Sequence, residues 1–188
     1  MTLRKFIGLF QVGFLDLVAG AFIAHILHLS FYSSPPPLFI YLLGAIVAAL
    51  PDIDILITLS QKKTLNLTHR NTIFHQPMVF MAVPAFILIF IHTFWALFWA
   101  LPLLFHYLHD TIGESSGIQW FSPFKPSKFA LWDFNQAGQR KLLVTHPPHY
   151  RGFTLDKALE KKFYRLTPTS IIEATLPLIL LGIIIFTW

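Results

Sequence analysis

Histidine and aspartate recur at three places in an otherwise apolar chain, and these residue types can bind divalent cations. The first place holds Asp52 and Asp54, which follow Pro51 directly. Proline disturbs a helix, and two carboxylates at this spacing can converge on one cation if the backbone is extended. A carboxylate close to lipid is costly unless it is paired or bound to a metal. The alternative is that the apolar segment ends at Leu50 and both aspartates are solvated.

The second place is a polar segment that contains His69, Arg70 and His75. Neutral imidazoles are good ligands for zinc and iron. Arg70 carries a planar fork that suits phosphate or carboxylate, but its guanidinium has no acceptor atom and cannot bind a metal. We therefore expect Arg70 to contact an anionic group of a substrate or its transition state. The alternative is a solvated arginine or one that binds a lipid headgroup.

The third place comprises His106, His109 and Asp110. Spacings of three and four residues put these side chains on one face of a helix. His106 and Asp110, one turn apart, could chelate one metal ion. Asp110 could instead accept a hydrogen bond that fixes the tautomer of a histidine. The alternative is a polar helix end that meets water.

The elements that must position these residues are apolar. The chain has 188 residues, of which 55% are hydrophobic and 12% charged, and its mean hydropathy is +0.61. A soluble domain has about 25% charged residues, so lipid is the natural surrounding for the long apolar blocks. The chain has no cysteine, which leaves histidine and carboxylate as ligands and favours Zn, Mn or Fe. We relate the net charge of +5 to membrane topology and predict no nucleic-acid partner.

The apolar blocks predict an all-α integral membrane protein with about five transmembrane helices. Residues 1–188 form a single membrane domain, with predicted spans at about 6–29, 38–59, 77–91, 93–112 and 171–188. The uncharged stretch 77–108 would make a helix of about 48 Å, against a hydrocarbon core of about 30 Å, so we place a turn near His92 and Thr93. The polar segment 113–169 is a small insertion, in which 128–134 and 140–145 are predicted to pair as a hairpin. Residues 155–166 have the pattern of an amphipathic helix.

The charges predict the orientation of the spans. All 14 Lys and Arg residues lie in the N-terminal segment, in 61–76 or in 113–169. Positively charged loops stay in the cytoplasm, so these three segments are predicted to be cytoplasmic and the C-terminus external. A single helix over 77–108 would send most of the cations outside. All three histidine and aspartate clusters then reach the cytoplasmic face.

Taken together, the clusters resemble a family of inner-membrane metal-dependent hydrolases of the YdjM type, also described as LexA-binding. The resemblance covers residues 44–124 and rests on Leu50-Pro51-Asp52-Ile53-Asp54, His69-Arg70 with His75, His106-x-x-x-Asp110-Thr111-x-Gly113, and Pro123-Phe124. The family's loop usually reads His-Arg-Gly-x-Thr-His-Ser, whereas this chain has one more residue between the histidines and Gln76 after the second. The family also has a histidine in its first helix. Asp16 and His25 are the candidates here, and we favour Asp16 because it lies nearer the predicted cytoplasmic side.

The resemblance and the residues together predict a metal-dependent hydrolase at the cytoplasmic face of the cell inner (plasma) membrane. The chain would be multi-pass with a cytoplasmic N-terminus, and its partners would be membrane lipid and a phosphoester or lipid-like substrate. The predicted ligands of one or two divalent metal ions are Asp16, Asp52, Asp54, His69, His75, His106 and Asp110. Arg70 and Asp110 are the predicted catalytic residues.

Two other functions are compatible with the sequence. One is a non-catalytic membrane protein that is stabilised by metal and binds a protein partner. The other is an ion- or proton-coupled transporter, in which polar residues should be spread through the depth of the bilayer. The polar residues here crowd at one face, with Asp16 as the main exception, and this favours the enzyme.

Overall fold

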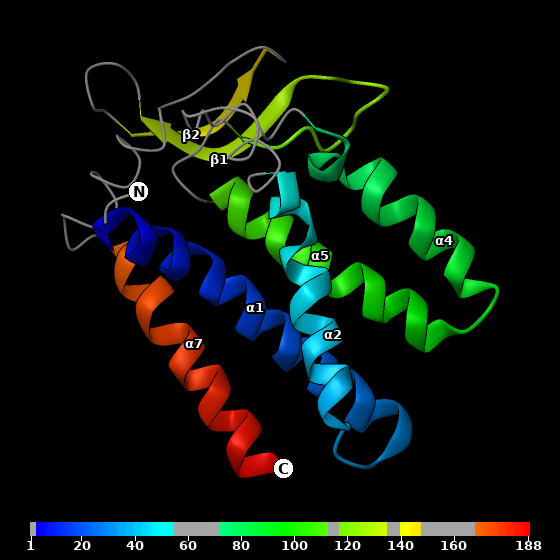
Figure 1. The fold of residues 1–188 in the computed structure, drawn as a ribbon. Helices are drawn as coiled ribbons and strands as arrows, with labels where there is room; N and C mark the ends of the chain where they lie inside the picture. The colour runs from blue at the N-terminus through cyan, green and yellow to red at the C-terminus, as the bar shows by residue number, and fades with distance from the viewer. Residues whose placement is uncertain (1–2, 55–71, 113–116, 135–139, 148–167) are drawn as a thin grey trace.

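The structure is a computed structural model, and it describes residues 3–54, 72–112, 117–134, 140–147 and 168–188. Within them the chain is mostly helical, as predicted (Figure 1). The helices are α1 (Leu3–Tyr32), α2 (Leu38–Ala49), α4 (Val83–Ile89), α5 (Thr93–Ile112) and α7 (Pro168–Thr187), and the strands are β1 (Lys128–Phe134) and β2 (Arg140–His146). Two 3-10 turns, η1 (Leu50–Asp52) and η3 (Ile73–His75), and one π-helical turn, η4 (Met78–Ala82), complete the described elements. His69, Arg70 and the predicted amphipathic segment 155–166 lie outside the described residues.

Helix α1 is central, because it packs against α2, α5 and α7. Its contact with α2 is unusually close. A Cβ atom on Gly20 would lie 2.3 Å from the carbonyl oxygen of Gly44, and one on Gly44 would lie 2.5 Å from the carbonyl oxygen of Gly20. Ala24 and Ala48 follow each glycine by four residues and continue the small surface. Such pairs of small residues let membrane helices approach backbone to backbone.

Side-chain contacts at two positions along α1 give the direction of its neighbours. Midway along the helix, Asp16 contacts His109, which also contacts Glu173 in α7. Further along, His25 contacts Thr187 at the end of α7 through a 2.9 Å hydrogen bond. Helices α1 and α7 therefore run in the same direction, as Figure 1 shows.

Helix α5 runs opposite to α1. Phe94, in its first turn, packs against Phe31 and Tyr32 at the end of α1. His109, in its last turn, reaches back to Asp16, midway along α1. Helix α4 ends at Ile89 and α5 begins at Thr93, so the chain reverses over residues 90–92, where the sequence places the turn.

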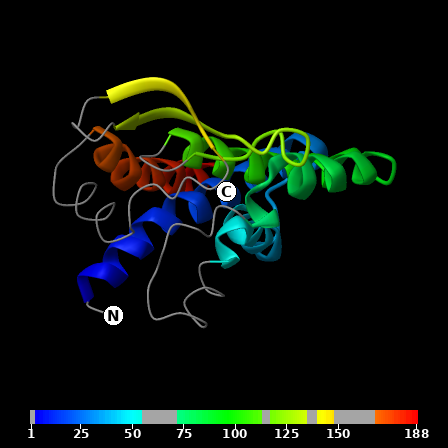
Figure 2. The ribbon, with the colours of Figure 1, turned by 90° about the horizontal axis from the view of Figure 1, so that it is seen from above.

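The two strands form the antiparallel hairpin that the sequence predicts, with Lys128 opposite His146 and Phe134 opposite Arg140. Figure 2 shows the hairpin on the outside of the helices. It is tied to the end of α5 through the preceding segment, where Trp120 Nε1 donates a 2.8 Å hydrogen bond to Thr111. Gly117 adopts a φ of 77°, and a Cβ atom there would lie 2.6 Å from the carbonyl oxygen of Phe129. Only glycine fits this close approach.

Among the described residues, one stretch, Gly13–Tyr32 in α1, is long and apolar enough by itself to cross a membrane. The shorter apolar helices are Leu38–Asp52, Met78–Ile89 and Ile171–Thr187. Helices α2, α4 and α7 expose large apolar side chains on their outer surfaces, among them Leu38, Phe86, Phe90, Ile179 and Phe186. Surfaces of this kind suit contact with lipid.

Candidate metal centre

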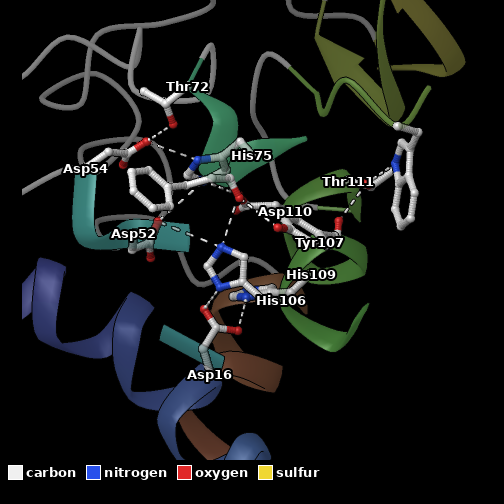
Figure 3. A network of polar contacts seen from close by, with 12 residues as sticks. Asp16, Asp52, Asp54, Thr72, His75, His106, Tyr107, His109, Asp110 and Thr111 are labelled. Carbon is white, nitrogen blue, oxygen red and sulfur yellow. Dashed lines mark hydrogen bonds and ion pairs between the residues drawn. The ribbon is translucent and has the colours of Figure 1, made fainter. Parts of the chain in front are cut away.

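Three side chains from separate elements converge at the end of α5. Asp52 comes from η1, His75 from η3 and His106 from α5, and one ligand atom of each lies within 4.8 Å of the other two. Asp52 Oδ1 lies 3.7 Å from His75 Nε2 and 3.8 Å from His106 Nε2. Figure 3 shows both imidazoles turned toward the same space. These three residues could hold a metal ion.

Asp110 approaches the same two nitrogens. Its Oδ2 atom lies 3.5 Å from His75 Nε2 and 3.6 Å from His106 Nε2. In Figure 3 Asp52 and Asp110 flank the gap between the two imidazoles from opposite sides. Asp110 sits one helical turn after His106, so α5 supplies both side chains from one face.

The residues present fit a divalent cation. The four contacts are longer than hydrogen bonds, whose usual limit is about 3.2 Å for nitrogen and oxygen. They are close to the roughly 3.4 Å that separates ligand atoms around a tetrahedral ion with bonds of about 2.1 Å. The Nε2 atom of His106, which points into this space, is buried and makes no hydrogen bond within the described part of the chain. Two imidazoles and two carboxylates form a donor set that suits Zn, Mn or Fe.

The opposite edge of His75 faces a third aspartate. Asp54 Oδ2 lies 3.2 Å from His75 Nδ1 and also accepts a hydrogen bond from the hydroxyl of Thr72. A carboxylate on Nδ1 holds the proton there and leaves the lone pair on Nε2, as around many metal-bound histidines. Asp54 is thus placed to orient His75. Sequence reasoning missed Thr72, for which no spacing or motif gives a signal.

The backbone around these aspartates is not extended. The extended segment that would turn Asp52 and Asp54 side by side toward one cation is therefore absent here. Pro51 lies within the 3-10 turn Leu50–Asp52, and the next residue stays helical, with φ −60° and ψ −27° at Ile53. Successive side chains of such a turn point in different directions, so Asp52 faces Nε2 of His75 and Asp54 faces Nδ1.

His106 has an equivalent arrangement on its own Nδ1. Asp16 Oδ2 from α1 lies 3.3 Å from His106 Nδ1, and Asp16 Oδ1 lies 3.0 Å from His109 Nδ1. We predicted from the sequence that Asp16 and Asp54 bind the metal directly, and this remains a prediction. In the structure each faces the Nδ1 atom of a histidine whose Nε2 atom points into the centre.

His25, the other candidate in the first helix, lies elsewhere. Its Nδ1 atom is 2.7 Å from the hydroxyl of Tyr41, and its Nε2 atom is 2.9 Å from Thr187. The structure therefore brings Asp16, and not His25, to the three clusters. The remaining predicted site residues, His69 and Arg70, are outside the part of the chain that the structure describes.

A buried tyrosine that the sequence does not single out supports His75. The hydroxyl of Tyr107 donates a 2.7 Å hydrogen bond to the carbonyl oxygen of Phe74. This bond joins α5 to η3 beside the ligand that η3 carries. Tyr107 is fully buried, but in sequence it is one apolar aromatic residue among many in α5.

Three carboxylates around His75 raise the pKa of its imidazole. Burial alone would lower the pKa of the His75 imidazole, but its contacts with the carboxylates of Asp110, Asp52 and Asp54 raise that pKa to about 9. Without a cation the imidazole is therefore protonated at neutral pH. A cation that binds through Nε2 must displace this proton.

The fold and the site define a mostly helical protein with a buried histidine and aspartate cluster at one end of an apolar bundle. A sequence model of the family described as YdjM inner membrane protein matches residues 14–186. The chain therefore belongs to this family, and its place is the inner membrane. No curated protein and no solved structure matches the chain.

Proposed function

We propose that this protein is a membrane-embedded metal-dependent hydrolase that acts at the cytoplasmic face, on a phosphoester or lipid-like substrate. The observation that carries the proposal is the convergence of Asp52, His75 and His106 on one space. A divalent cation held there would acidify a water molecule so that it can act as a nucleophile near neutral pH. These three protein ligands would leave the fourth position of a tetrahedral ion for that water, as in hydrolytic metal sites.

The chain's own residues would divide the work. His75, His106 and Asp52 would bind the cation, because their ligand atoms face one another. Asp110, whose Oδ2 atom faces the same two imidazoles, would lie beside the cation as the predicted catalytic carboxylate. The side chain of Asp52 is 25% exposed, against 10% or less for the other three, so solvent and substrate would approach from the side of Asp52. Arg70 would then stabilise negative charge that develops on the substrate.

The proposed topology has five spans and a cytoplasmic N-terminus. The distribution of Lys and Arg supports it, and so do the helix directions. Helices α1 and α7 run the same way, while α5 runs opposite to α1. The end of α5 and the start of α7 then share one side of the membrane with the metal centre, which Asp16 reaches from midway along α1. The C-terminus would lie outside.

Hydrolysis can be tested on detergent-purified, metal-loaded protein with a panel of phosphomonoesters, phosphodiesters and phospholipids. The informative variant is Arg70→Lys, which keeps the charge and loses the bidentate fork. It should keep its metal and lose about tenfold or more in turnover, as expected for a charge-assisted contact of about 1.5–3 kcal/mol. Unchanged turnover would remove Arg70 from the mechanism. A metal-loaded wild type that hydrolyses nothing in the panel would favour the metal-stabilised binding protein instead.

Reporter fusions test the topology separately. A reporter fused after Trp188 should behave as external, and one inserted at Gly138 as internal. The same signal from both positions would contradict the five-span arrangement. Neither result depends on whether the protein is an enzyme.

A further inference from the structure

The metal centre is connected to α7 by a row of buried ionisable side chains. Asp16 lies between His106 and His109, with contacts of 3.3 Å and 3.0 Å to their Nδ1 atoms. The Nε2 atom of His109 lies 3.2 Å from Glu173 Oε1 in α7. The row thus reads His106, Asp16, His109, Glu173, and it crosses from α5 to α1, back to α5 and on to α7.

The side chain of Glu173 is buried, which is unusual for a residue of α7. Most of the described side chains of α7 are exposed or half-buried, and only Glu173 and Pro177 among them are buried. A carboxylate in such a position is costly unless it faces a cation or a donor. The imidazole of His109 fills this role, because it can donate from both ring nitrogens when it is protonated.

The packing of α7 against α1 does not require a glutamate at position 173. The helix is held at its other end by the hydrogen bond between Thr187 and His25. A hydroxyl or an apolar residue at position 173 would pack in the bundle without the cost of a buried charge. The carboxylate instead faces His109, the histidine that also contacts Asp16.

We infer that Glu173 is a positioning residue of the metal centre, acting through His109 and Asp16 on the orientation of His106. This rests on the proposed metal site, although not on its hydrolytic activity. Glu173 holds His109, His109 holds one oxygen of Asp16, and the other oxygen of Asp16 fixes the imidazole of His106. The C-terminal helix therefore contributes to metal affinity without touching the metal.

The test is the Zn²⁺ dissociation constant of purified protein in detergent, measured by competition with a chromophoric chelator. Glu173→Gln keeps the size of the side chain and removes its charge. It should weaken Zn²⁺ binding by about three- to tenfold, below the roughly 10- to 100-fold loss typical when a group in contact with a ligand is removed. Thr175→Val is the matched control, because within the described residues the hydroxyl of Thr175 donates only to the carbonyl oxygen of Ile171 in its own helix. It should bind Zn²⁺ like the wild type.

The same substitution made in His109→Gln protein shows whether Glu173 affects Zn²⁺ affinity through His109. In His109→Gln protein, the change Glu173→Gln should cause no further loss, because the connection is already broken. The absorption spectrum of bound Co²⁺ should also differ between wild type and Glu173→Gln, since the orientation of His106 changes. A merely structural role would lower the melting temperature of the metal-free protein and leave both readouts unchanged.

Three outcomes would overturn the inference. Equal Zn²⁺ affinity of the wild type and Glu173→Gln would remove Glu173 from the metal centre. An equal loss in the wild-type and His109→Gln backgrounds would show that the effect does not pass through His109. A wild type that binds no Zn²⁺ or Co²⁺ would remove the proposed metal site itself, together with the inference built on it.

Discussion

Metal binding should release a proton from His75, and the amount should depend on pH in a defined way. In the metal-free protein the neighbouring carboxylates raise the pKa of His75 to about 9, against an ordinary value of 6.5. At about pH 7.5 a group with this pKa is roughly 97% protonated. Each cation that binds to Nε2 should therefore displace about one proton from this residue.

The same pKa gives the sign of the effect on stability and affinity. A raised pKa means that the protonated imidazole stabilises the metal-free fold below pH 6.5 and that this contribution disappears as the pH rises through about 9. A shift of this size corresponds to about 3 kcal/mol. Protons compete with the metal over the same range, so the apparent affinity should increase by about tenfold per pH unit up to about pH 9.

Isothermal titration calorimetry with Zn²⁺ in buffers of different ionisation enthalpy measures the number of protons released. We expect about one or more protons to be released per cation at about pH 7.5, and fewer as the pH rises above about 9. Asp54→Asn removes one of the three carboxylates and should lower the pKa of His75, so fewer protons are released at about pH 8.5. Tight Zn²⁺ binding without proton release at about pH 7.5 would refute this account of His75.

Three further predictions concern residues that shape the site. Gly20→Ala should lower the melting temperature, because its Cβ atom would lie 2.3 Å from a backbone oxygen, whereas Gly13→Ala meets nothing within 4 Å and should not. Tyr107→Phe should weaken Zn²⁺ binding by about two- to tenfold through loss of a hydrogen bond of about 0.5–1.5 kcal/mol. The control is Tyr41→Phe in α2, which loses the hydrogen bond between its hydroxyl and His25 of α1. It should leave the Zn²⁺ dissociation constant unchanged, because this bond is distant from the metal centre. Asp16→Asn should weaken Zn²⁺ binding by about 10- to 100-fold, and an unchanged constant would separate Asp16 from the metal centre.

Features encoded locally could be predicted from the sequence. Hydropathy and its breaks indicate the helices, the reversal at residues 90–92 and the hairpin, because each depends on neighbouring residues. The spacing of His106 and Asp110 places both on one face of α5, where the structure has them. Their proximity to Asp52 and His75 followed from the predicted topology, which brought all three clusters to one side of the membrane.

Features that depend on packing between distant segments could not be predicted. Asp16 meets His106 and His109 only because α1 and α5 pack side by side in opposite directions. Whether a carboxylate faces Nε2 or Nδ1 of a histidine depends on the local turn, and the 3-10 turn at Asp52 brings Asp54 to Nδ1 of His75. Glu173 could be seen as a charge beside lipid that needs a partner, but the sequence gives no reason to choose His109.

The most direct test of the central claim is the metal content of the purified protein, loaded with Zn²⁺ and freed of excess ion. The account predicts about one equivalent or more in the wild type and a large loss in Asp52→Asn and in His106→Gln. Gel filtration and the melting temperature of the metal-free forms would establish that both variants are folded. Full metal occupancy in both folded variants would contradict the assignment of Asp52 and His106 as ligands.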